Sequence, residues 1–118
     1  MSQEFDPGAF LIFQLESGYG LLRVLGHRET GDDKVWHVTV YREMFLDPEM
    51  AEHAISHSSL TPEIPHAALT NRAFESTQVA FMAHQPLTTS ELEGLDEWLS
   101  EPDGRVYDRS IRLLLGVR

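Results

Sequence analysis

The sequence predicts an α+β fold in a single domain over residues 1–118: a strongly bent antiparallel sheet, or a partly open barrel, of five or six strands with two helices. Between residues 10 and 41, three apolar β-like runs are joined by two turn sequences. Two later segments begin with helix-capping residues and continue with apolar residues at helical spacing. A chain of 118 residues can form one hydrophobic core and is too short for two.

The first three strands form a predicted β-meander over residues 10–41. The run 10–15 is apolar on both faces, which indicates a central strand that is covered from two sides. In the third run, one face carries Trp36, Val38 and Val40, and the other carries His37, Thr39 and Tyr41. This period of two is typical of a half-buried antiparallel strand, so we expect one face of the sheet to be core.

A first helix is predicted over residues 48–57. The Asp47 side chain can cap the free amides of its first turn, and the proline that follows fits the first helical position without the loss of a hydrogen bond. We expect Met50 and Ala54 to face the sheet, with Ile55 as a third candidate.

The second half of the chain carries weaker signals. Residues 58–65 contain two prolines, which forbid a regular helix and predict an extended loop. Two further strands are expected within residues 66–83, with Asn71-Arg72 near a turn. The segment 109–116 is predicted to return as a strand that covers a sheet edge, and a short helix is the alternative.

A second helix is predicted over residues 89–100. The sequence Thr88-Thr89-Ser90-Glu91 matches a capping box, in which the threonine hydroxyl and the glutamate carboxylate each accept from the other's backbone amide. The apolar residues of this helix recur at helical spacing: Leu92, Leu95 and Leu99, with Trp98 beside them. This stripe should dock on the sheet.

The composition disfavours several classes of partner. With 9 basic and 19 acidic residues the net charge is −10, which opposes binding to nucleic acid and to anionic membranes. The start of the chain has no basic leader region, and no apolar run approaches the ~18 residues of a membrane span. The absence of cysteine removes thiol chemistry. We therefore expect a cytoplasmic protein, either a monomer or a homodimer.

The second helix carries a surface of one charge sign, with no Lys or Arg between residues 88 and 104. Its acidic residues are Glu91, Glu93, Asp96, Glu97, Glu101 and Asp103. One interpretation is a solvated helix face that Arg105, Arg109 and Arg112 partly neutralise. The other is a docking face for a basic protein, with Tyr19 and Asp32 at the two hairpin tips as further contacts.

A small-ligand or enzymatic site in the mouth of the barrel is the alternative. Trp36, Tyr41 and His37 are its predicted lining. No catalytic sequence motif supports it, because the chain lacks both a Gly-x-Ser-x-Gly elbow and a phosphate loop. We expect no cofactor.

Two histidines raise the question of a metal site. His53 and His57 are four residues apart and share one face of the first predicted helix. The glutamate precedes the first histidine, so the segment does not match the HExxH pattern of metalloproteases. A third ligand is needed, and His66 or Asp47 are the candidates, so no metal is assigned.

The segment from Phe10-Leu11-Ile12-Phe13-Gln14-Leu15 through Gly18-Tyr19-Gly20 to Leu21-Leu22-Arg23-Val24-Leu25-Gly26 resembles the opening of small SH3-like barrel proteins among bacterial immunity proteins, the immunity protein 26 type. The resemblance covers about a third of the chain. It implies an SH3-like, partly open barrel and a non-catalytic protein that neutralises a partner toxin. No binding residue of that family can be carried over, because the later segments match no motif.

Overall fold

The fold is known from a computed structural model, which describes residues 5–31, 33–101 and 104–116. Its elements are β1 (Ala9–Leu15), β2 (Gly18–Thr30), β3 (Asp33–Tyr41), α1 (Pro48–Ser56), β4 (Pro62–Thr70), α2 (Asn71–Thr77), β5 (Ala80–His84), α3 (Glu93–Ser100) and α4 (Ile111–Leu115). The predicted α+β class and the β-meander are confirmed. Asp32 and Asp103 lie outside the described residues.

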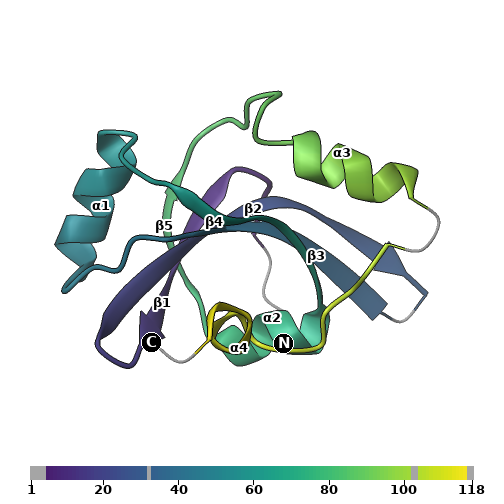
Figure 1. Ribbon diagram of the computed structural model, residues 1–118, viewed down its shortest axis with the longest axis horizontal. Coiled ribbons are helices and arrows are strands. Elements are labelled where there is room, and N and C mark those ends of the chain that lie inside the picture. The colour runs from purple at the N-terminus through teal and green to yellow at the C-terminus, as the bar shows by residue number, and fades with distance from the viewer. Residues whose placement is uncertain (1–4, 32, 102–103, 117–118) are drawn as a thin grey trace.

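The five strands form one antiparallel sheet in the order β4-β3-β2-β1-β5. The register shifts in three of the four strand pairs, between β1 and β5, β2 and β3, and β3 and β4. Bulges of this kind bend strands, and Figure 1 shows a strongly curved sheet. In the described part of the chain β4 and β5 are the two edges, so the sheet is bent but not closed into a barrel.

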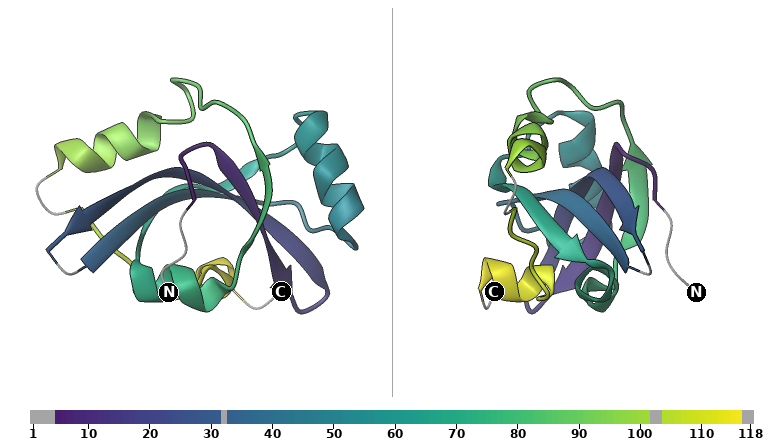
Figure 2. Two further views of the ribbon diagram at one scale, coloured as in Figure 1. Left: turned by 180° about the vertical axis from the view of Figure 1, so that it is seen from behind. Right: turned by 90° about the vertical axis from the view of Figure 1, so that its right-hand side faces the viewer.

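Both faces of the sheet are covered. In Figures 1 and 2 α2 and α4 lie on the concave side, called here the inner face, and α1 and α3 lie beyond the other side, the outer face. Successive residues of β1 point to opposite faces: Leu11 and Phe13 join the inner core, and Phe10 and Ile12 join the outer one. The predicted two-sided cover of the first strand is therefore confirmed.

The inner core is built around Trp36. Its ring stacks on Phe74 of α2 with 4.0 Å between ring centroids, and its Nε1 donates to Asn71 Oδ1 at 2.9 Å. Val38 and Val40 are fully buried on the same face. The alternation predicted for the third strand is thus correct for its apolar side.

The two strands predicted within residues 66–83 form, as β4 and β5, but their bounds and the connection between them differ from the prediction. The first strand, β4, begins earlier, at Pro62, inside the predicted loop, and its prolines are tolerated because it is an edge strand. The predicted turn at Asn71 is replaced by the first residue of the helix α2. The helix forms because the Thr70 hydroxyl accepts from the Ala73 amide at 3.1 Å and caps its N-terminus.

The predicted C-terminal strand over residues 109–116 is wrong, and the alternative of a short helix, α4, is what forms. Its side chains serve the inner core: Ile111 is fully buried there. Arg112 donates to the carbonyl oxygens of Gln14 at 2.6 Å and Thr77 at 2.7 Å. The edge of β4 is met instead by Tyr107, in a single parallel bridge to Leu69.

The helices of the outer face differ in detail from their predictions. In α1 the Asp47 cap forms, but Met50 is 48% exposed, and Ala51 is buried in its place beside Ala54 and Ile55. In α3, which begins at Glu93 rather than at residue 89, no residue is fully buried and Leu99 is 51% exposed. The apolar stripe of α3 therefore docks only in part. Among the described residues, no helix is both long enough and apolar enough to cross a membrane.

Replacement of Phe74 by Ala tests the inner core. The ring is fully buried and stacked on Trp36, so Phe74→Ala should lower the free energy of unfolding by about 3 to 5 kcal/mol. The matched control is Phe81→Ala, which removes a ring that is 58% exposed and should cost about 1 kcal/mol or less. Urea denaturation measures both, and equal losses would contradict the assignment of Phe74 to the core.

Candidate functional site

The outer face of the sheet holds a pocket of about 600 Å³ between α1 and α3. Its floor is formed by residues of the three central strands: Phe10, Arg23, Thr39 and Tyr41. Ile55 and Leu60 line it on the α1 side, and the segment from β5 into α3 contributes Pro86, Glu91, Glu93 and Glu97. Figure 1 shows this segment arching over the sheet from β5 to α3. The size is within the range of small-ligand pockets.

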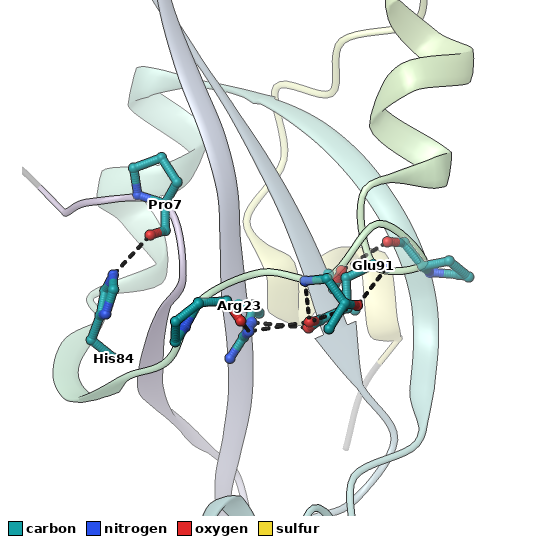
Figure 3. A network of polar contacts seen from close by, with 8 residues as sticks. Pro7, Arg23, His84 and Glu91 are labelled. Atoms are coloured by element: carbon teal, nitrogen blue, oxygen red, sulfur yellow. Dashed lines mark hydrogen bonds and ion pairs between the residues drawn. The ribbon is translucent and has the colours of Figure 1, made fainter.

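Arg23 lies at the centre of the pocket floor and is only 2% exposed. Its Nη2 donates to Glu91 Oε1 at 3.2 Å and to the Pro86 carbonyl oxygen at 3.1 Å, and its Nε lies 3.0 Å from Glu91 Oε2 (Figure 3). The guanidinium also covers the ring of Phe10 at 4.1 Å from the centroid. The charge of Arg23 is therefore held on the outer face of the sheet by one carboxylate, one carbonyl oxygen and one aromatic ring.

The Nη1 atom of Arg23 is buried and has no hydrogen-bond partner among the described residues. Burial removes the water molecules that hydrogen-bond to such a donor. If the protein supplies no acceptor in their place, the folded state loses free energy, and it loses more when the donor belongs to a charged group than when it is neutral. Most buried polar atoms in proteins are paired, so this donor is an exception. Because the atom has almost no accessible surface, a ligand in the pocket would reach it only if Arg23 or its neighbours moved.

Glu91 joins the start of α3 to the sheet. Its Oε1 accepts from the Thr88 amide at 3.0 Å, and its own amide donates to the Thr88 hydroxyl at 3.2 Å. The reciprocal bonds of the predicted capping box therefore form, but in the turn before α3, whose N-cap is Leu92. The same carboxylate pairs with Arg23. Glu91 is therefore engaged within the protein and is not a free part of the acidic face.

Tyr41 is the second polar group of the pocket floor. Its ring stacks on Phe10, with 6.1 Å between centroids, and is 7% exposed. The pKa of Tyr41 is raised to about 12, mainly by burial, with Arg23 opposing the change and Glu91 adding to it. The phenol thus keeps its proton at neutral pH and can donate a hydrogen bond.

The remaining predicted acidic residues divide into two groups. Glu93 and Glu97 line the pocket, whereas Asp96 and Glu101 are exposed on α3 and do not. Within residues 5–31, 33–101 and 104–116, the only ion pair made by the acidic set is that of Glu91 with Arg23. The predicted neutralisation is not seen for Arg112, which binds backbone carbonyls elsewhere.

Tyr19, predicted to be a contact residue at a hairpin tip, lies within a strand and is half-buried. It is the second residue of β2, its side chain is half-buried against the outer core, and its backbone pairs with Phe45 at 2.7 and 2.8 Å. Asp32, the other predicted tip contact, falls outside the described residues.

The predicted pocket of Trp36, Tyr41 and His37 does not form as a unit. Tyr41 lines the observed pocket, but Trp36 is fully buried on the opposite face of the sheet. His37 lies beneath α3, where its Nδ1 is 2.9 Å from His66 Nε2 and its ring meets the Trp98 ring at 4.8 Å between centroids. Alternation along β3 explains the separation of Trp36 from its neighbours.

The His37–His66 pair lies under α3 in its neutral form, with His37 buried and His66 half-buried. The pKa of His37 is lowered to about 4, mainly by burial and in addition by neighbouring His66 and Arg28; burial also lowers the pKa of His66. Gly94 of α3 allows the close approach, since a Cβ there would lie 2.7 Å from the Cβ of His66.

No metal site is supported in the described residues, where no three His, Cys, Asp or Glu side chains converge. His53 and His57 stack at 4.0 Å between ring centroids on α1, as their spacing predicts. His66, the candidate third ligand, is instead bonded to His37.

Comparisons of this chain with protein-family profiles, with curated protein sequences and with solved structures find no match. The functional argument therefore rests on the pocket and its charges. Sequence reasoning missed Arg23 as its central residue. The available signal was a single arginine inside the apolar run Leu21-Leu22-Arg23-Val24-Leu25, which a strand buried on both faces can hold only with a partner.

Glu91→Gln tests the ion pair at the pocket floor. Without the carboxylate charge the buried guanidinium is uncompensated, so the free energy of unfolding should fall by about 2 kcal/mol, less than for a fully buried pair because Glu91 is 30% exposed. Glu93→Gln, the same change at an exposed position, should cost about 0.5 kcal/mol or less. The double variant Arg23→Met/Glu91→Gln should recover part of the loss in urea denaturation, and a purely additive result would argue against the pairing.

The histidine pair predicts a loss of stability in mild acid. Above pH 6.5, the ordinary pKa of histidine, neither the folded nor the unfolded chain protonates His37. As the pH falls from 6.5 to about 4, the unfolded chain gains a proton that the folded chain does not, so the folded state loses about 2 to 3 kcal/mol; below about 4 this contribution stops changing. His37→Gln/His66→Gln should flatten this part of the pH profile in urea titrations, and an unaltered slope would refute the assignment.

Proposed function

We propose that this protein is a non-catalytic binding module that recognises a basic protein segment at the outer-face pocket and the adjoining surface of α3. The observation that carries the proposal is the position of Glu93 and Glu97, which line the pocket with no ion-pair partner among the described residues. Exposed carboxylates beside a partly apolar pocket favour a cationic group with an aliphatic stem, as in lysine and arginine.

The charge balance of the site supports a cation over an anion. Glu91 offsets the single positive charge of Arg23, which leaves the two carboxylates of Glu93 and Glu97 uncompensated at the pocket. The net charge of −10 over the whole chain adds a long-range attraction, which raises association rates for basic partners more than it raises affinity.

A small-ligand function is the second candidate, and the enclosed polar floor favours it. Arg23 and Tyr41 would orient a ligand of modest size in a pocket of about 600 Å³. An enzymatic version of this candidate would have carboxylates rather than a histidine as its base, because His37 and His66 lie under α3 and do not line the pocket, whereas Glu93 and Glu97 do.

The resemblance of the first third of the chain to SH3-like immunity proteins suggests one identity for a basic partner, namely a toxin that this protein would neutralise. An acidic surface and a non-catalytic pocket are compatible with such a role. The curved five-stranded sheet is also compatible with an SH3-like relationship, which stays a proposal.

Two matched double variants test the proposed function. Glu93→Gln/Glu97→Gln removes two charges that line the pocket, and Asp96→Asn/Glu101→Gln removes two charges from the same helix outside it. With a fluorescent lysine-rich peptide at low salt, the first variant should bind about 5- to 10-fold more weakly, and the second should change binding by about 2-fold or less. A glutamate-rich peptide of equal length should not bind in fluorescence anisotropy.

Equal losses in the two variants would mean that α3 attracts cations only through its general charge, and would remove the pocket from the proposal. No binding of the lysine-rich peptide to the wild-type protein would reject a basic ligand altogether.

A further inference from the structure

The pocket is polarised from floor to rim. Its floor carries the protonated hydroxyl of Tyr41, a hydrogen-bond donor on a side chain that is more than nine-tenths buried, beside the guanidinium of Arg23, whose unpaired Nη1 has almost no accessible surface. Its α3 side presents the exposed carboxylates of Glu93 and Glu97. A ligand that satisfies both ends must carry an acceptor oxygen on one side and a cation on the other.

The acceptor should be neutral. The positive charge of Arg23 is already compensated by Glu91, which lies 3.0 Å from its Nε, so an incoming carboxylate would meet Glu91 without a net positive charge to attract it. An amide carbonyl oxygen can accept from the Tyr41 hydroxyl without that repulsion. The apolar surfaces of Phe10, Ile55 and Leu60 would then contact aliphatic carbons between the two polar ends.

We propose that the pocket holds a single lysine or arginine residue of a peptide chain, with its main-chain carbonyl directed to the Tyr41 hydroxyl and its side-chain cation directed to Glu93 and Glu97. This inference rests on the proposed function and narrows it to one residue and one orientation. Neither polar group of the ligand is sufficient alone for tight binding. The pocket floor binds the amide, and the α3 side binds the cation.

Three small probes separate the two contributions. Nα-acetyl-lysine methylamide carries both the amide and the cation, n-butylamine carries only the cation, and Nα-acetyl-norleucine methylamide carries the amide with an uncharged side chain of similar length. Titrations followed by ¹H–¹⁵N correlation spectra, including the Arg23 Nε–H signal, should show the tightest binding for the first probe. Shifts should concentrate at Arg23, Tyr41 and Gly94, which line the pocket.

Tyr41→Phe is the variant that tests the orientation, because it removes the hydroxyl and keeps the ring that stacks on Phe10. It should weaken Nα-acetyl-lysine methylamide about 3- to 10-fold and leave n-butylamine unchanged. Glu97→Gln should weaken both amines and leave the norleucine probe unchanged, and Glu101→Gln, outside the pocket, should alter none of the three.

The outcomes distinguish this inference from the proposed function. If lysine-rich peptides bind but the amine and the lysine amide are equally weak, with no effect of Tyr41→Phe, the pocket floor does not bind the amide carbonyl and the inference is overturned. If the norleucine probe binds as well as the lysine probe, the cation is irrelevant and the inference is again overturned. If no basic peptide binds the wild-type protein, the proposed function itself fails.

Discussion

The ion pair between Arg23 and Glu91 is the interaction on which the outer half of this structure depends. It joins residues 68 positions apart in sequence, one in the central strand β2 and one in the turn that opens α3. Because the guanidinium also takes the Pro86 carbonyl, it fixes both ends of the segment that bridges the sheet. That segment forms one wall of the pocket. The buried charge of Arg23 therefore determines the shape of the pocket.

The two faces of the sheet solve different packing problems. On the inner face, two short helices supply large side chains such as Phe74 and Ile111, and the core is apolar and filled. On the outer face, α1 and α3 cover different parts of the curved sheet, and α3 buries no residue completely. The space between them is bridged by a chain segment rather than filled by side chains. Incomplete cover of a curved sheet is therefore the physical origin of the pocket.

Burial also controls the ionisable groups of the outer face. His37 and Tyr41 lie four residues apart on β3, so their side chains are on the same face of the sheet. Both are buried there. Each is held in its neutral form, the phenol by a raised pKa and the imidazole by a lowered one. The groups that stay charged are Arg23 with its partner Glu91, and the exposed Glu93 and Glu97 of α3. The pocket therefore has a hydrogen-bond donor at its floor and carboxylates on its α3 side.

The sequence by itself determined the elements that depend on local rules. The meander follows from alternation and turn residues, α1 from the Asp47 cap, and the start of the α3 region from the reciprocal bonds of Thr88 and Glu91. Only tertiary structure decided that residues 111–115 form a helix, since the placement of Ile111 in the inner core outweighs any β preference of an apolar pentapeptide. The pairing of Arg23 with Glu91 was equally out of reach of local patterns, because no short-range spacing relates two side chains that meet only when distant segments pack across one face of a sheet.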